Sequence, residues 1–129
     1  MKTFATAAAA LLFMAGAAMA QGIDGTWQTQ PNDDGNIAHV QFSKCGERYC
    51  GTLVRSYDSS GKQFKSKNNG KNLVWDMVDA GNGSFKSGKI WDPGADKTYR
   101  SKMQLSGDRL KVSGCIAIIC KSQTWVRVK

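Results

Sequence analysis

Apolar and polar residues alternate along most of this chain, in runs that are typical of β-strands. Such runs, of about five to nine residues each, are separated by turns rich in Gly, Asn, Asp and Ser. They cover residues 25–30, 36–44, 49–57, 73–78, 84–91, 97–106, 109–114 and 123–128. No stretch with the 3.6-residue period of a helix follows residue 20. The pattern therefore predicts an all-β domain.

The clearest strand register lies in KTYRSKMQLSGDRLKVSG, residues 97–114. A two-residue turn at 107–108 places Met103 opposite Val112 and keeps the apolar side chains on one face. A turn one residue longer would mix apolar and polar side chains on both faces, unless a bulge restored the phase. We therefore predict the two-residue turn. The opposite face then carries basic side chains into solvent, namely Arg100, Lys102, Arg109 and Lys111.

About eight short antiparallel strands with one apolar face each can be arranged in two ways. They close into a barrel, or they stack as a sandwich of two sheets. An up-and-down barrel has the advantage that it leaves no exposed strand edges. Composition and alternation alone do not choose between the two.

The first 20 residues have the layout of a secretory signal peptide. Lys2 gives a short positive start, residues 4–17 are almost entirely apolar, and Ala-Met-Ala at 18–20 is a typical cleavage site. We therefore expect a mature protein of one domain, residues 21–129, in the periplasm or secreted. A retained membrane anchor is the alternative, but the apolar run is short for a span and no later run matches it. We predict no transmembrane segment once the leader is removed.

The four cysteines form two pairs with the same spacing, Cys45 with Cys50 and Cys115 with Cys120. Export places them in an oxidising compartment, where an even number of cysteines favours disulfides. A zinc site of four thiolates usually needs two Cys-x-x-Cys motifs, and a redox site usually has one at the start of a helix. We therefore predict two local disulfides, with free or metal-binding thiols as the alternative. We predict no metal site and no cofactor.

The formal net charge of +8 favours acidic partners such as lipid headgroups, anionic polysaccharides or acidic proteins. An exported protein seldom meets nucleic acid, so we predict no nucleic-acid partner. The four basic side chains of the hairpin at 97–114 are a candidate surface for an anionic envelope component. A solvated face that only protects strand edges is the alternative. The lysine-rich connection at 61–72 suggests no particular role, and the sequence does not predict an oligomeric state.

The first and last predicted strands carry a tryptophan and a basic residue at characteristic places. Gly25-x-Trp27 lies in the first strand and Arg127 in the last. This arrangement resembles the calycin pattern of lipocalins, fatty-acid-binding proteins and avidins. In those barrels the tryptophan packs at the closed end, and the basic side chain lies across its indole face. The resemblance implies an up-and-down barrel of about eight strands, in which Trp27 and Arg127 have structural roles.

A closer resemblance covers most of the mature chain. The segments GTWQT, CGERYCGTLV, GKIWDPGADKTYRSKMQL, DRLKVSGC and CKSQTWVRV occur in the order found in an exported bacterial family called domain of unknown function 2147. The Gly-x-Ile-x-Asp-Pro segment at 88–93, followed by Tyr99, is the most specific part. We know no established activity for that family, so the resemblance implies export and a calycin-like barrel but no chemistry. The segment GKQFKSKNNGKN is more basic than the family pattern.

Few residues suggest catalysis. His39, the single histidine, has the opposite strand phase to Val40 and is predicted to be a solvated surface residue. The carboxylates at 33–34 suggest at most a loose calcium site. Asp76 and Asp79 could form a pair of catalytic carboxylates, but their place where a strand enters a turn explains both residues equally well. No Gly-x-Ser-x-Gly motif is present. We therefore predict that the protein is not an enzyme.

The inward strand phase contains side chains suited to a ligand pocket, namely Trp91, Tyr99, Ser101 and Met103. Trp and Tyr combine apolar area with a polar tip, Met adapts to irregular shapes, and a Ser hydroxyl orients one polar group. The prediction is a pocket for a small apolar or amphipathic molecule. The alternative is that tryptophans fill so narrow a barrel, which would leave the outer basic face as the working surface.

Overall fold

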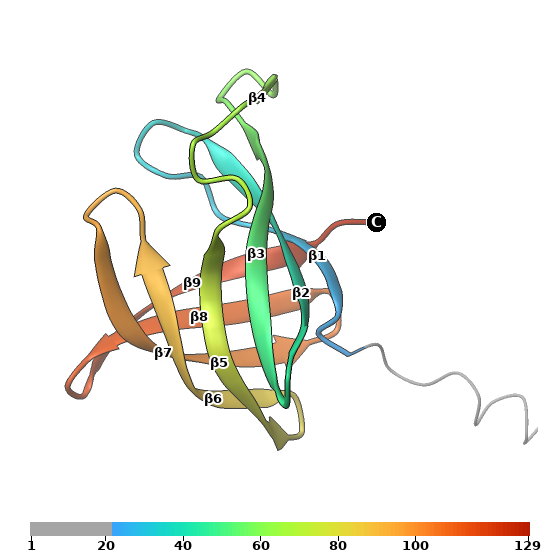
Figure 1. Cartoon of the computed structure of the whole chain (residues 1–129), viewed down its shortest axis with the longest axis vertical. Helices are drawn as coiled ribbons and strands as arrows, with labels where there is room; N and C mark the ends of the chain where they lie inside the picture. The colour runs from blue at the N-terminus through green and yellow to red at the C-terminus, as the bar shows by residue number, and fades with distance from the viewer. Residues whose placement is uncertain (1–21) are drawn as a thin grey trace, which may run out of the picture.

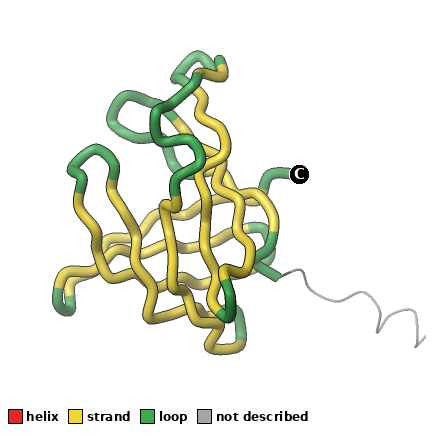
Figure 2. The backbone as a smooth tube through the Cα atoms, in the orientation of Figure 1, coloured by secondary structure: helices red, strands yellow, loops and turns green. Residues whose placement is uncertain are grey.

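The computed structural model describes residues 22–129, and this part of the chain contains β-strands and no helix (Figure 2). The predicted signal peptide, residues 1–20, lies outside the described residues. The strands are β1 (Gly25–Gln28), β2 (Ile37–Cys45), β3 (Arg48–Tyr57), β4 (Gln63–Phe64), β5 (Asn72–Gly81), β6 (Ser84–Asp92), β7 (Lys97–Ser106), β8 (Arg109–Ile116) and β9 (Ile119–Arg127).

Eight of these strands close into an antiparallel up-and-down barrel (Figure 1). Each pairs with its neighbours along the chain, and the β1–β9 pairing, with Trp27 opposite Arg127, closes the ring. The short strand β4 pairs only with β3, at the C-terminal end of that strand. The calycin-like barrel implied by the resemblance is therefore confirmed.

The connections between strands divide into two groups, one at each end of the barrel. The β2–β3, β5–β6 and β7–β8 turns are short and lie at the end where the chain enters β1. The β1–β2, β3–β5, β6–β7 and β8–β9 connections lie at the other end and include the longer loops (Figure 1). We call these the closed end and the open end.

The β7–β8 hairpin has the predicted register. Met103 pairs with Val112 and Gln104 with Lys111 across a two-residue turn. Several strand boundaries differ from the prediction by one to three residues, and the short strand β4 was not predicted. The largest difference is in β9, which begins at Ile119 rather than at residue 123. The cause is the cross-strand pair Cys115–Cys120, which extends the β8–β9 ladder toward the open end.

Both predicted disulfides are present, which confirms the pairing. Cys45–Cys50 links β2 to β3 near the closed end, with a Cα–Cα distance of 5.8 Å. Cys115–Cys120 links β8 to β9 near the open end, with a Cα–Cα distance of 4.1 Å. Each disulfide thus fixes one hairpin rather than joining distant strands.

The hydrophobic core occupies the interior from the closed end upward. Trp27 is fully buried and Trp125 is 2% exposed. Gly88 is needed where β6 crosses β5, because a Cβ there would lie 2.5 Å from the Met77 Sδ and 2.8 Å from the Trp75 carbonyl oxygen. The buried cluster comprises Ile23, Trp27, Val40, Phe42, Leu73, Val74, Met77, Phe85, Met103, Leu110, Val112 and Trp125.

His39 is not the solvated surface residue that the sequence predicts. Its side chain does lie on the outer face, paired in register with Gln28 of β1 and Arg55 of β3. However, His39 is only 9% exposed, because the Tyr57 ring lies against it with centroids 4.8 Å apart. Its Nε2 contacts the Gln28 Oε1 at 3.2 Å. Burial, together with the nearby Arg55 charge, lowers the pKa of His39 below its ordinary value of 6.5.

This burial predicts a pH dependence of stability. The unfolded chain binds a proton at His39 more readily than the folded barrel does, so stability falls as pH drops through 6.5. The loss is complete once the pH lies below the lowered pKa of the folded state. We expect the free energy of unfolding, measured with urea, to decrease between about pH 7 and pH 5, and His39→Gln to flatten that decrease.

Because the chain has one histidine, this decrease in the free energy of unfolding can be assigned to His39. Asp58 and Asp108 have pKa values below their ordinary value of 3.8, so they titrate at more acidic pH. An unchanged pH profile in His39→Gln would show that another group is responsible.

Candidate ligand cavity

The closed end is sealed by Trp27 and the last strand. The Arg127 guanidinium carbon lies 4.4 Å from the Trp27 ring centroid. The same guanidinium donates hydrogen bonds to the carbonyls of Gly22, Asp24 and Gly107, at 3.0–3.3 Å. The indole Nε1 of Trp27 donates to the Ile23 carbonyl at 2.9 Å. These contacts join the N-terminal segment, the β7–β8 turn and β9 across the base of the barrel.

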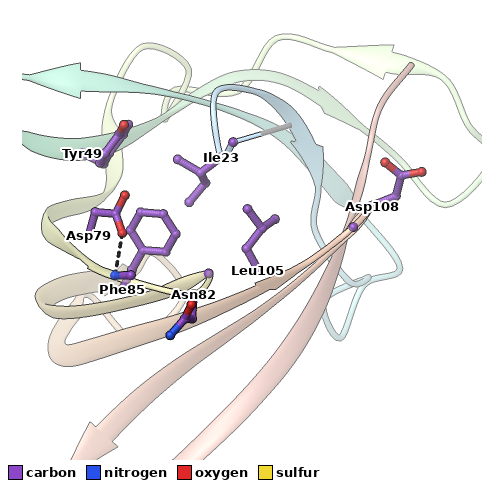
Figure 3. Close-up of a pocket in the computed structure, with 11 residues that line it drawn as sticks. Ile23, Tyr49, Asp79, Asn82, Phe85, Leu105 and Asp108 are labelled. Carbon is purple, nitrogen blue, oxygen red and sulfur yellow. Dashed lines mark hydrogen bonds between the residues drawn. The ribbon is translucent and has the colours of Figure 1, made fainter. Parts of the chain in front are cut away.

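A hollow of about 700 Å³ lies at this closed end (Figure 3). Its apolar side chains are Ile23, Tyr49, Phe85 and Leu105, and the Tyr49 and Phe85 rings meet edge to face with centroids 5.6 Å apart. The Asp79 carboxylate at its rim already accepts a hydrogen bond from the Gly81 amide at 2.9 Å. Ile23 and Phe85 belong to the core cluster, so the hollow lies directly over the core.

A larger cavity, of about 1170 Å³, opens at the other end of the barrel. It lies among the β1–β2, β3–β5, β6–β7 and β8–β9 connections, and Trp125 of the core forms part of its lining. Its other apolar lining includes Leu53, Leu73, Ile90, Val112, Trp91, Tyr99, Ile116 and Ile119. Its polar lining includes Asp33, Asp34, Ser56, Asn68, Asp92, Lys121, Ser122 and Gln123. The larger cavity therefore lies between the loops of the open end and the core side chains Val112 and Trp125.

Of the four residues that the sequence predicts to line a ligand pocket, two line the open-end cavity and two do not. Trp91 and Tyr99 line the open-end cavity. Ser101 is 4% exposed, and its hydroxyl donates to the Ser113 carbonyl at 2.6 Å. Met103 is 3% exposed and belongs to the core cluster. Ser101 and Met103 are therefore not among the residues that line the cavity, although Tyr99, Ser101 and Met103 share one face of β7.

Trp91 is held at the cavity rim by its neighbours. Its indole Nε1 donates to the Asp96 carboxylate at 2.9 Å, and the Lys71 ammonium lies 5.4 Å from its ring centroid. The Asp92 carboxylate accepts a hydrogen bond from the Gly94 amide at 3.0 Å, which fixes the β6–β7 turn. These contacts fix the position of the Trp91 indole at the cavity rim.

The sequence did not single out several residues that line the cavity. Leu53 and Leu73 come from β3 and from β5, and Gln123 and Lys121 come from the early part of β9. The Gln123 Oε1 accepts a hydrogen bond from the Trp125 indole at 2.9 Å. Strand alternation marks such residues as inward, but it does not show how far the core rises along the barrel.

The open-end cavity has the chemistry of a binding site. The residues that line it near the core are mostly apolar, whereas its mouth is lined by many polar side chains from the loops, Asp33, Asp34 and Asp92 among them. Such a layout is typical of sites for apolar or amphipathic molecules. Within residues 22–129, no group of three or more His, Cys, Asp or Glu side chains is placed to hold a metal ion.

The four predicted basic side chains lie together outside the barrel. Arg100, Lys102, Arg109 and Lys111 are all exposed, and their register places them on the outer face of β7 and β8. The ion pairs among the described residues join Asp108 to Arg127 and to Lys129, so none involves these four side chains.

No helix of the described chain is long and apolar enough to cross a membrane.

Comparisons with known proteins agree with this architecture. A family model described as "Uncharacterized protein conserved in bacteria (DUF2147)" matches residues 25–127. Protein HP1028 from Helicobacter pylori, a member of the lipocalin family, has a similar structure, with a TM-score of 0.69. The two chains are 19% identical, over 86% of this chain and 85% of that one, so the likeness concerns the fold. No curated protein sequence matches the chain significantly. The disulfides and the bacterial family are consistent with export.

Proposed function

Since the chain belongs to the DUF2147 family of bacterial proteins and folds as a lipocalin-like barrel, we propose that it binds a small apolar or amphipathic molecule in the open-end cavity. We propose that this protein is a binder rather than an enzyme, and that it works in the periplasm or outside the cell. The observation that carries the proposal is the cavity itself. Its volume of about 1170 Å³ lies just above the range of ordinary ligand sites, roughly 300–1,000 Å³, so a small molecule has room in it.

The distribution of side chains favours one orientation of the ligand. Leu73, Val112 and Trp125 surround the inner part of the cavity and are buried. Lys121 and Gln123 are exposed residues of its lining. An amphipathic molecule can bury its apolar part against the first group while its polar group stays near the second.

A cavity-filling substitution tests the proposal. Gly114 lines the cavity, and a Cβ built there meets the Ile90 Cγ2 at 3.4 Å and the Tyr99 Cβ at 3.7 Å. Gly114→Leu therefore projects a side chain between these two walls. We expect a fluorescent fatty acid to bind the parent protein, and Gly114→Leu to weaken its dissociation constant at least about tenfold, since the inserted side chain takes the ligand's place.

Thr124→Leu is the matched control, because Thr124 is exposed and its register with Lys111 places it outside the barrel. It adds a comparable side chain to the same sheet without entering the cavity, so it should bind the probe like the parent. Circular dichroism shows whether each variant is folded. Equal binding by the parent and a folded Gly114→Leu variant would mean that the probe does not occupy the cavity.

The outer face of β7 and β8 supports a second candidate function, the binding of an anionic envelope component. Its four basic side chains are exposed and have no acidic partner among the ion pairs of residues 22–129. In this case Lys102→Glu combined with Lys111→Glu abolishes association with an anionic polysaccharide, and salt weakens the parent's binding steeply. Binding to the cavity probe would be unaffected by that double substitution.

A further inference from the structure

We propose that the turn between β8 and β9 is a membrane-contacting tip, which places the open end of the barrel on an anionic lipid surface. The turn exposes three isoleucines close together in sequence. Ile116 is 66% exposed, Ile118 is 96% exposed and Ile119 is 70% exposed. Single exposed apolar residues are common on protein surfaces, but a contiguous group of large ones usually marks an interaction site.

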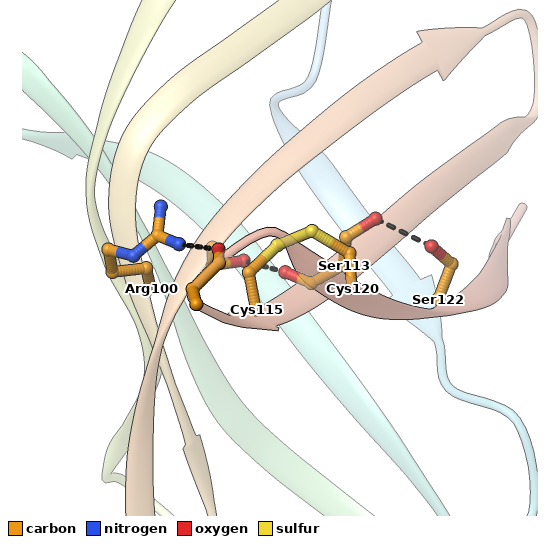
Figure 4. Close-up of a disulfide and its surroundings, with 7 residues drawn as sticks. Arg100, Ser113, Cys115, Cys120 and Ser122 are labelled. Atoms are coloured by element: carbon orange, nitrogen blue, oxygen red, sulfur yellow. Dashed lines mark hydrogen bonds between the residues drawn. A yellow bond between two sulfur atoms is a disulfide. The ribbon is translucent and has the colours of Figure 1, made fainter.

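The tip is held in a defined shape (Figure 4). The Cys115–Cys120 disulfide lies directly below it. The Arg100 guanidinium donates to the carbonyl of Ala117, a residue whose φ of 54° is in the left-handed region. Below the disulfide, the Ser113 and Ser122 hydroxyls are 2.7 Å apart and hydrogen-bonded. The isoleucines are therefore presented outward by a cross-linked turn, which limits the entropy lost when they bind a partner.

The tip adjoins the mouth of the open-end cavity. Ile116 and Ile119 belong to the cavity lining, whereas Ile118 at the apex does not. Figure 1 shows the turn at the far end of the β8–β9 hairpin, away from the C-terminus. A surface that holds the tip therefore also lies beside the opening through which a ligand would enter. Passage of a ligand between that surface and the cavity rests on the proposed function, whereas the docking itself does not.

The charge around the tip complements an anionic surface. Residues 97–129 contain one acidic residue, Asp108, which lies in the closed-end turn. Of the basic residues in this segment, Arg109, Arg127 and Lys129 also lie at the closed end, which leaves Arg100 and Lys121 as the cations nearest the tip. Lys121 directly follows the disulfide, and Arg100 touches the turn. Apolar side chains flanked by cations are the combination that binds anionic lipid surfaces.

A lipid surface fits this tip better than a second copy of the chain. A stable protein interface buries about 1,600 Å² in total, which is far more than one turn with three isoleucines can supply. A second copy would also bring its own Arg100 and Lys121 against the same cations. Anionic lipid headgroups avoid this repulsion. A bilayer can also take up a few apolar side chains of one turn without offering a complementary pocket.

The test is flotation of the exported protein with phosphatidylcholine vesicles, with and without phosphatidylglycerol. We expect binding to the anionic vesicles, and at least a tenfold loss of the bound fraction in Ile118→Ser. Ile118 is almost fully exposed, so this change leaves the core intact. Val126→Ser is the matched control, because Val126 is an exposed apolar residue of β9 near the closed end and should bind like the parent.

Three results would overturn the proposal. The first is a parent that does not float with anionic vesicles. The second is an Ile118→Ser variant that floats like the parent while Lys102→Glu/Lys111→Glu does not, which would assign binding to the outer basic face. The third is a concentration-dependent dimer in sedimentation that Ile118→Ser dissolves. Ile118→Ser should keep its affinity for the fluorescent fatty acid, so failure of docking and failure of cavity binding are distinguishable.

Discussion

Replacing Trp27 with alanine should lower the free energy of unfolding by about 3–5 kcal/mol, the range for truncating a large buried aromatic side chain. Trp27 is fully buried in the core cluster. Its removal leaves a cavity at the base of the barrel and leaves the Ile23 carbonyl without its indole donor. It also removes the ring over which the Arg127 guanidinium lies. These losses act together at the point where β1 and β9 close the barrel.

Urea unfolding followed by far-ultraviolet circular dichroism measures this loss without depending on tryptophan fluorescence. Trp75→Ala is the matched control, because Trp75 is only half-buried and its register with Lys89 places it on the outer face. We expect a loss of about 1 kcal/mol there, since most point changes outside the core are small. Equal losses at the two positions would contradict the structural role of Trp27 at the closed end.

Removal of both disulfides should cost about 4 kcal/mol in total. Each closes a loop with a sequence separation of 5, and loop-closure entropy gives about 2 kcal/mol for a loop of that size. The Cys45→Ala/Cys50→Ala and Cys115→Ala/Cys120→Ala variants remove them one at a time. Alanine is the suitable replacement because Cys50 and Cys115 are buried, and a serine would bury a hydroxyl.

The losses in free energy of unfolding from removing each disulfide should add, because one disulfide lies near the closed end and the other near the open end, with no shared partner. Urea unfolding of the two double variants and of the quadruple variant measures this directly. A quadruple variant that loses much more than the sum would show that the two hairpins are coupled. A double variant with an unchanged free energy of unfolding would show that its loop is equally constrained without the disulfide.

Local pattern predicts the parts of this fold that depend on neighbouring residues. The β7–β8 register follows from strict alternation on both sides of a two-residue turn, which leaves one pairing of Met103 with Val112. The disulfides follow from equal spacing and export, because each links residues of one hairpin. The choice of barrel over sandwich did not come from alternation. It came from the resemblance, carried by Trp27 and Arg127 at the two ends of the sequence.

Features that depend on distant strands are beyond local pattern. Alternation places His39 on the outer face correctly, but Tyr57 and Gln28, which cover it, come from other strands. Tyr99 and Met103 share a face of β7, yet one lines the cavity and the other lies in the core. The height at which the core ends depends on side chains from all eight barrel strands. Likewise, the apolar residues between Cys115 and Cys120 give no sign in the sequence that they face solvent.

The four tryptophan indole N–H groups offer the most direct test of ligand binding inside the barrel. Trp91 and Trp125 line the open-end cavity, Trp27 lies at the closed end, and Trp75 lies outside. We propose to titrate a fatty acid into ¹⁵N-labelled protein and to follow these indole resonances by NMR. If the cavity binds the ligand, the Trp91 and Trp125 signals should shift in a saturable way, while those of Trp27 and Trp75 stay in place. Unchanged Trp91 and Trp125 signals at high ligand concentration, or shifts confined to Trp75, would contradict binding in the cavity.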